Sequence, residues 1–317
     1  MSRKPTLTLT LFIMLLLAAI PSSLRAADKK GQRVSLWAAE PPHDNGDPKD
    51  EAYIQVFLPE KSRATGRAVV ICPGGAYCCV VMDCEGTDWA PFFTQQGIAA
   101  IVLHYRLPHG NYKVPIEDAE QAMRVVRRNA KRWNINPEDV GIMGSSAGGH
   151  LASTIATHAK GDALPDFQIL FYPVITMDPA FTHRDTHDNF LGKDAKKKME
   201  QLYSNDTQVT RQTPRAWIAL ADDDNIVVPA NGFNYYFECY RHDVPASLHI
   251  YPYGGHWGGM RTSFPFHAEM LMNLKSWLSS FLHRRPRIPS WHDDAPECPR
   301  VSPCRHDEAS PMPPHAT

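Results

Sequence analysis

The chain has 317 residues, of which 43% are hydrophobic and 21% charged, a composition that suits one large globular domain. Its formal net charge of −1 argues against nucleic acid or an anionic membrane as a partner. A small neutral substrate agrees better with this balance.

The first 26 residues have the pattern of a secretory signal peptide. Arg3 and Lys4 precede an apolar run from Leu7 to Ile20, and small residues then favour cleavage after Ala26. The run is short for a membrane span, which needs about 20 residues, although an uncleaved anchor is the alternative. We therefore expect a secreted or periplasmic protein that has no membrane contact once the signal is removed.

Short apolar runs alternate with helical segments along the mature chain. Residues 115–133, for example, place their apolar side chains on one helical face. This alternation predicts an α/β fold, in which helices cover both faces of a mostly parallel central sheet. The strand-like runs are 52–58, 68–72, 98–104, 139–143, 167–172, 216–221 and 246–251.

Two regions break the alternation. The polar stretch 176–212 is expected to be an excursion between strands, forming a partial lid. From about residue 284 the chain is proline-rich and aperiodic, which is typical of a disordered tail. The domain boundaries that follow are 1–26 for the signal peptide, 27–283 for the folded domain and 284–317 for the tail.

Residues 144–148, Gly-Ser-Ser-Ala-Gly, match the G-x-S-x-G pattern of a nucleophile turn. A strand-like run precedes them and a helix-like run follows, which is the context that this turn requires. The centre of the pattern is Ser146, not Ser145. The Ala147 amide and the helix N-terminus would stabilise an oxyanion. The alternative is a glycine-rich turn that performs no chemistry.

A serine nucleophile needs a base, and His256 has the position for it. In this architecture the chain order is serine, acid, histidine, and His256 follows the run 246–251 in a glycine-rich loop. The chain has 15 histidines, so most of them are incidental. His150 and His158 are expected to point elsewhere from a helix, and His249 is expected to pack within its strand.

The base needs a carboxylate to orient it, and three aspartates follow the run 216–221. We favour Asp224, which lies nearest the start of the next helix. Asp223 is second, and Asp222 is also a candidate. A second oxyanion donor should come from the loop after 68–72, where Gly75 and Ala76 offer backbone N–H groups.

No cofactor or metal is expected. His183 and His187 are four residues apart, but Asp185 and Thr186 do not favour a helix, so the segment is interpreted as a loop. A bridge from Cys78 or Cys79 to Cys84 and buried free thiols are both open, and the pairing is undetermined. The seven cysteines are Cys72, Cys78, Cys79, Cys84, Cys239, Cys298 and Cys304.

Several motifs together resemble one subfamily of α/β hydrolases, the bacterial acetyl-xylan and feruloyl-type carbohydrate esterases, relatives of the hormone-sensitive-lipase-like enzymes. The resemblance covers about residues 35–283 and implies that Ser146 is the nucleophile, Asp224 the acid and His256 the base. It also implies an oxyanion hole from the amides of Gly75, Ala76 and Ala147. The motifs are "PGGAY", "EG" at 85–86, "LHYRLP", "GIMGSSAGGHLAS", "LYSNDTQV", "DDDNIVVPANG" and "LHIYPYGGH".

Three residues depart from the subfamily pattern, and they bear on the acyl pocket. Ala76 and Trp257 stand where glycine is usual, and Ser145 stands where an apolar residue often lies. Tyr77 and Trp257 are candidates for stacking on a sugar ring, with a purely structural role as the alternative. The added bulk favours a small acyl group.

The function expected is a secreted serine esterase that removes acyl groups, chiefly acetyl, from plant-polysaccharide sugars such as xylan. Its partner would be an acylated oligosaccharide or polysaccharide. The alternatives are a feruloyl esterase, a prolyl-oligopeptidase-like serine peptidase, for whose extra domain the chain lacks room, and a non-catalytic carbohydrate-binding protein. Acyl preference, sugar preference and oligomeric state stay open.

Overall fold

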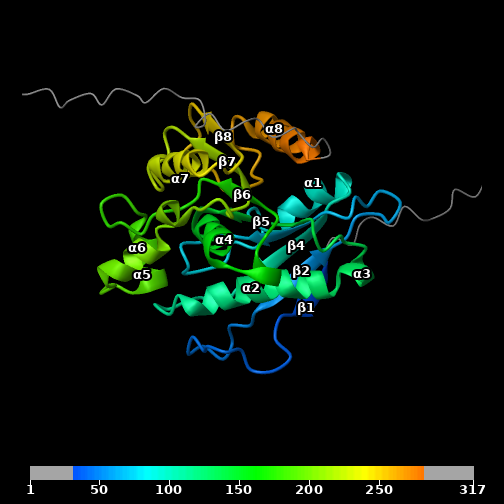
Figure 1. Cartoon of the computed structure of the whole chain (residues 1–317), viewed down its shortest axis with the longest axis horizontal. Helices are drawn as coiled ribbons and strands as arrows, with labels where there is room; N and C mark the ends of the chain where they lie inside the picture. The colour runs from blue at the N-terminus through cyan, green and yellow to red at the C-terminus, as the bar shows by residue number, and fades with distance from the viewer. Residues whose placement is uncertain (1–30, 282–317) are drawn as a thin grey trace, which may run out of the picture.

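The computed structural model describes residues 31–281, so the expected signal peptide and tail lie outside the described part. An eight-stranded sheet in the order β1-β2-β4-β3-β5-β6-β7-β8 runs through the molecule (Figure 1). The first two pairs are antiparallel, and every pair from β4 to β8 is parallel. The strands are β1 (Gln32–Ser35), β2 (Tyr53–Phe57), β3 (Ala68–Cys72), β4 (Ala99–His104), β5 (Val140–Ser145), β6 (Phe167–Phe171), β7 (Arg215–Ala221) and β8 (Ala246–Tyr251).

Helices cover both faces of this sheet, as expected (Figure 1). Buried side chains of α2, α3, α4 and α7 belong to one hydrophobic core, and those of α1 and α8 belong to another across the sheet. The expected fold class is therefore confirmed. The helices are α1 (Ala90–Gln95), α2 (Lys113–Arg128), α3 (Ala130–Trp133), α4 (Ser146–His158), α5 (Arg184–Leu191), α6 (Lys197–Tyr203), α7 (Ala230–Arg241) and α8 (His267–Ser280).

The excursion between β6 and β7 contains α5 and α6, which lie side by side at one end of the molecule (Figure 1). The interpretation of 183–187 as a loop is wrong, because α5 begins at Arg184. Tertiary packing outweighs the weak helix propensity of this segment, since Thr186, His187 and Phe190 are all buried.

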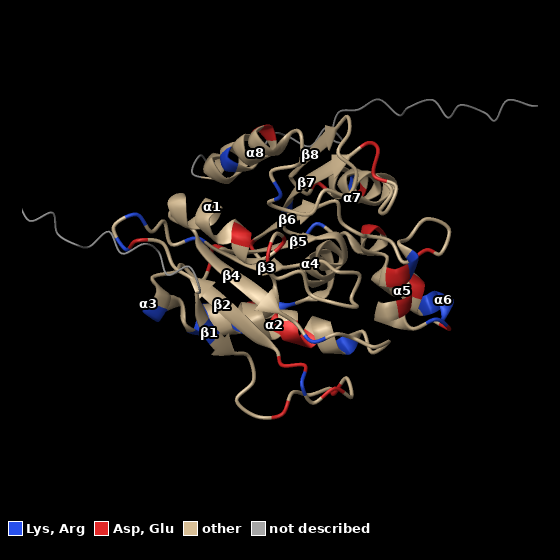
Figure 2. Ribbon diagram, turned by 180° about the vertical axis from the view of Figure 1, so that it is seen from behind, with Lys and Arg blue, Asp and Glu red and all other residues tan. Residues whose placement is uncertain are grey.

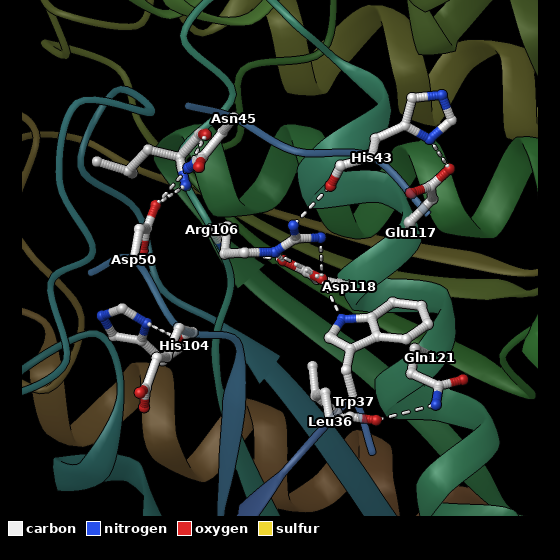
Figure 3. Close-up of polar contacts among 12 residues, drawn as sticks. Leu36, Trp37, His43, Asn45, Asp50, His104, Arg106, Glu117, Asp118 and Gln121 are labelled. Atoms are coloured by element: carbon white, nitrogen blue, oxygen red, sulfur yellow. Dashed lines mark hydrogen bonds and ion pairs between the residues drawn. The ribbon is translucent and has the colours of Figure 1, made fainter. Parts of the chain in front are cut away.

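A buried ion pair joins the loop after β4 to α2. The Arg106 guanidinium donates to both carboxylate oxygens of Asp118, with an Nη2–Oδ1 distance of 2.8 Å. The Trp37 indole N–H donates to the same carboxylate at 2.7 Å, and Arg106 also donates to the His43 carbonyl (Figure 3). These contacts attach the segment between β1 and β2 to the outer part of the sheet.

Charged residues are spread over many elements and both signs are intermixed (Figure 2). Within residues 31–281, no helix combines the length and apolar character that a membrane span requires. The cysteines of this part of the chain, Cys72, Cys78, Cys79, Cys84 and Cys239, are all free thiols.

Candidate active site

The candidate residues come from loops that follow parallel strands at one edge of the sheet. Gly75 and Ala76 follow β3, Ser146 follows β5, Asp224 follows β7 and His256 follows β8. Neighbouring parallel strands place their carboxyl ends at the same edge, which is where ligand sites of such sheets form. Segments more than a hundred residues apart therefore meet at one point.

Ser146 occupies a strained turn between β5 and α4. Its φ is +53°, a left-handed conformation that is uncommon for residues other than glycine. The flanking glycines permit the turn: a Cβ at Gly144 would lie 2.0 Å from the Gly148 carbonyl oxygen. Likewise, a Cβ at Gly148 would lie 2.0 Å from the Cys72 carbonyl oxygen. Close packing around this turn therefore requires glycine at positions 144 and 148.

Ser146, His256 and Asp224 form a continuous hydrogen-bonded line. Ser146 Oγ lies 2.9 Å from His256 Nε2, and His256 Nδ1 lies 2.7 Å from Asp224 Oδ2. Because a carboxylate accepts, His256 carries its proton on Nδ1, which leaves Nε2 to accept the Ser146 proton. This arrangement can activate a serine hydroxyl as a nucleophile.

Burial distinguishes Asp224 from the neighbouring aspartates. Asp224 is only 4% exposed, and its Oδ1 accepts the amides of Ile226 and Val227 at 2.9 and 3.0 Å. Asp223 is exposed and accepts the Gly255 amide at 2.7 Å, which lowers the pKa of its carboxyl. Asp224 therefore hydrogen-bonds to the His256 side chain, whereas Asp223 hydrogen-bonds to the backbone of the residue before His256.

The loop after β3 passes directly over the Ser146 turn. A Cβ at Gly74 would lie 3.0 Å from Ser146 Cβ, so only glycine allows this approach. The next residues, Gly75 and Ala76, have φ values of +122° and +52°. The Asn189 side chain of α5 donates to the Ala76 carbonyl at 2.8 Å. Gly75 and Ala76 therefore belong to a tightly turned loop beside Ser146, while Ala147 follows Ser146 as the second residue of α4.

Tyr77 and Trp257 do not offer ring faces to a ligand. Tyr77 is 1% exposed and stacks on Phe190, with 4.9 Å between ring centroids. Trp257 is 6% exposed and stacks on Phe264 at 4.2 Å. Their expected role in sugar stacking does not fit these positions, because other aromatic rings already cover them.

Three other histidines make contacts that suit a structural role. His150 is buried, with the Tyr77 hydroxyl 3.0 Å from Nδ1 and the Tyr203 carbonyl 2.9 Å from Nε2. His249 packs against the Trp217 ring from β8. His187 has one ring nitrogen beside Asp188 and the other beside Glu200. Among residues 31–281, no group of three or more histidine, cysteine or acidic side chains is arranged to hold a metal.

Two residues of this region were not identified from the sequence as site residues. The Glu85 carboxylate, 5% exposed, accepts the Gly74 amide at 2.7 Å and the Tyr172 hydroxyl at 2.8 Å. The Tyr172 ring in turn packs against His256, with 4.5 Å between ring centroids. The "EG" motif contains Glu85 but indicates no role for it, and Tyr172 ends a strand-like run without any motif.

The chain is similar in sequence to known hydrolases. A family model described as alpha/beta hydrolase fold matches residues 69–240. The acetylxylan esterase of Xylanibacter ruminicola is 44% identical over 249 residues, which are 77% of this chain and 50% of that protein. Endo-1,4-beta-xylanase B of Butyrivibrio fibrisolvens is 31% identical over 205 residues, 59% of this chain and 32% of that protein. The chain therefore spans half or less of the length of these two relatives.

A solved structure has the same architecture, and the match covers a larger share of both chains. The acetyl ester-xyloside bifunctional hydrolase from Caldicellulosiruptor lactoaceticus superposes with a TM-score of 0.74 at 28% identity. The match covers 80% of this chain and 97% of that one. The loops that carry the candidate residues thus lie within an architecture already seen in a hydrolase.

Proposed function

Since this chain belongs to the α/β-hydrolase fold family, we propose that it is a serine esterase that removes acetyl groups from acetylated xylan or xylo-oligosaccharides. The observation that carries the proposal is the line from Ser146 Oγ through His256 to Asp224, with distances of 2.9 and 2.7 Å. A serine in a strained turn, a base at hydrogen-bond distance and a buried acid are the parts that acyl transfer needs.

The chemistry follows from this geometry in two halves. In the first, Ser146 Oγ attacks the acetyl carbonyl carbon while His256 Nε2 takes the hydroxyl proton. The C–O bond to the sugar then breaks, and the imidazolium returns that proton to the leaving sugar oxygen. In the second, a water molecule gives a proton to His256 and attacks the acyl carbon of the acyl-serine. The bond from that carbon to Ser146 Oγ then breaks, the imidazolium returns the proton to Oγ, and acetate is released.

The backbone around Ser146 would stabilise the negative oxygen of each tetrahedral intermediate. We assign this role to the amides of Gly75, Ala76 and Ala147, which come from the loop over Ser146 and from the start of α4. Backbone donors fixed in place need no reorganisation when charge develops, and one such donor typically contributes about 10²–10³ in rate.

Two observations support acetyl groups on xylan-type sugars. The relative with 44% identity is named an acetylxylan esterase, and the solved structure with 28% identity is named an acetyl ester-xyloside hydrolase. The pattern of residues 1–26 supports export, which would place the enzyme among extracellular or periplasmic polysaccharide fragments.

A substrate panel tests the proposal. Initial rates are compared for acetyl, butyryl, octanoyl and feruloyl esters, for acetylated xylo-oligosaccharides and for an aminoacyl anilide. We expect acetyl esters to be preferred over butyryl and octanoyl esters, and the anilide to stay intact. Preference for ferulate would move the assignment to feruloyl esterase. Preference for octanoyl esters or cleavage of the anilide would contradict an acetyl esterase.

A further inference from the structure

We propose that Glu85 and Tyr172 are positioning residues. They hold the loop over Ser146 and the His256 loop in fixed positions relative to each other. This inference rests on the proposed esterase function and deepens it. Neither residue touches the reacting atoms, so their effect is exerted through the two loops.

The Glu85 carboxylate is the point where the loop after β3 is fixed. Its Oε2 accepts the Gly74 amide at 2.7 Å, immediately before the two residues assigned to the oxyanion. A Cβ at Gly74 would lie 2.5 Å from Oε2 and 2.8 Å from the Ser145 carbonyl oxygen. The loop is therefore held between this carboxylate and the nucleophile turn, without space for a side chain.

Tyr172 extends the connection to the base. Its hydroxyl donates to Glu85 Oε1 at 2.8 Å and accepts the Gly259 amide from the loop that carries His256. Its ring packs against the His256 and Trp257 rings, with centroid distances of 4.5 and 4.4 Å. One tyrosine thus fixes both the backbone of the base loop and the plane of the imidazole.

The base loop also rests on the chain segment that bears the carboxylate. The Met260 amide donates to the Cys84 carbonyl at 2.8 Å, and a Cβ at Gly259 would lie 2.2 Å from the same oxygen. Cys84 precedes Glu85 in the chain. A shift at residues 84–85 would therefore move the loop over Ser146 and the base loop together.

The hydrogen bonds favour an ionised Glu85. Gly74 N–H and Tyr172 O–H are both donors, so both carboxylate oxygens accept. Burial nevertheless raises the pKa of this carboxyl, and the hydrogen bonds from Tyr172 and Gly74 oppose that rise.

Two variants test the positioning role. Glu85→Gln keeps the side-chain shape but removes the charge and one acceptor, whereas Tyr172→Phe keeps the ring and the charge but removes the hydroxyl. Both should lower kcat by about 10- to 100-fold with KM changed by less than about threefold, because displaced oxyanion donors act on the transition state.

The assay uses the full-length enzyme and a simple chromogenic acetyl ester, with melting temperatures to confirm folding. Glu120→Gln, at a half-buried glutamate paired with Arg124 on α2, is the matched control and should keep wild-type kinetics. If Glu85→Gln does not fold, the split between kcat and KM in Tyr172→Phe decides the positioning claim.

Two results would overturn the proposal or its premise. A kcat within twofold of wild type in either folded variant contradicts the positioning role. Wild-type protein inactive on every ester contradicts the proposed function, whereas active wild-type protein with fully active variants contradicts only this inference.

Discussion

Ser146 combines backbone strain with a buried setting. Its left-handed φ costs of the order of 1–3 kcal/mol for a residue with a Cβ, and the glycines at 144 and 148 are needed because the turn leaves no space for side chains. Contacts with the loop after β3 and with the start of α4 hold Ser146 in this conformation. Strain maintained at one hydroxyl beside a histidine is typical of a reactive site.

Asp224 and Asp223 should respond differently to the same substitution. Asp224→Asn removes the charge that holds the His256 tautomer and stabilises the imidazolium, so we expect kcat to fall by about 10³–10⁴-fold. Asp223→Asn keeps an oxygen to accept the Gly255 amide, and we expect a loss of less than about tenfold. Steady-state kinetics of the two folded variants provide the comparison. A larger loss in Asp223→Asn would assign the acid to the neighbouring residue.

His150 links stability to pH. Complete burial lowers its pKa to about 4, whereas an exposed histidine titrates near 6.5. A depressed histidine pKa means that the neutral form stabilises the fold above pH 6.5, and that this contribution is lost as the pH falls towards 4. The loss amounts to about 3 kcal/mol over this window.

Urea unfolding at several pH values tests this link. His150→Gln should be less stable than wild type at pH 7, because it loses the contacts to Tyr77 and Tyr203. Its stability should then fall less between pH 6.5 and pH 4, because glutamine does not titrate. Parallel stability curves for the two proteins would show that His150 does not become charged on unfolding.

At the scale of elements, the parallel strands determine where the site lies, and the loops that follow them carry its side chains. The loops after β3, β5, β7 and β8 converge because parallel strands end at one edge, and the loop from β6 contributes Tyr172. Helix α5 adds the Asn189 contact to the Ala76 carbonyl. The excursion between β6 and β7 thus supports the site from one side.

Breaking the buried pair of Arg106 and Asp118 should destabilise the protein more than breaking an exposed pair. Asp118→Ala leaves an uncompensated guanidinium in the interior, and we expect unfolding free energy to fall by about 3–5 kcal/mol. Glu51→Ala breaks the exposed pair with Arg33 and should cost less than about 1 kcal/mol. Chemical denaturation of both variants provides the test, and equal losses would contradict the role given to burial.

The strands and the order of the candidate residues could be predicted because they depend on local patterns. Apolar runs located β2 to β8, and the glycine frame located Ser146. The short β1 escaped prediction because its residues are mostly exposed. Helix α5 escaped because its stability comes from packing rather than from propensity.

The finer details of the site depend on contacts between distant segments. The sequence contains three adjacent aspartates, and only the structure separates Asp224 from the others, by its burial and its hydrogen bond to His256. Tyr77 and Trp257 lie near site residues in the chain, but Phe190 and Phe264 cover them from elsewhere. Glu85 and Tyr172 are 87 residues apart, so no local pattern could pair them.

For the whole molecule, the near-neutral charge agrees with a neutral substrate. The formal net charge of −1 provides little steering for an anionic ligand, and the intermixed charges in Figure 2 agree with this. Ser146 and the side chain of His256 are largely buried. A neutral sugar ester, as proposed above, suits this charge balance.

The most direct test of the account is acetate release from acetylated xylo-oligosaccharides by wild-type, Ser146→Ala and Ser145→Ala proteins with matched melting temperatures. We expect wild-type protein to release acetate, Ser145→Ala to retain most of that rate, and Ser146→Ala to lose several orders of magnitude. Comparable acetate release by folded Ser146→Ala would contradict the proposed nucleophile and, with it, the serine esterase mechanism.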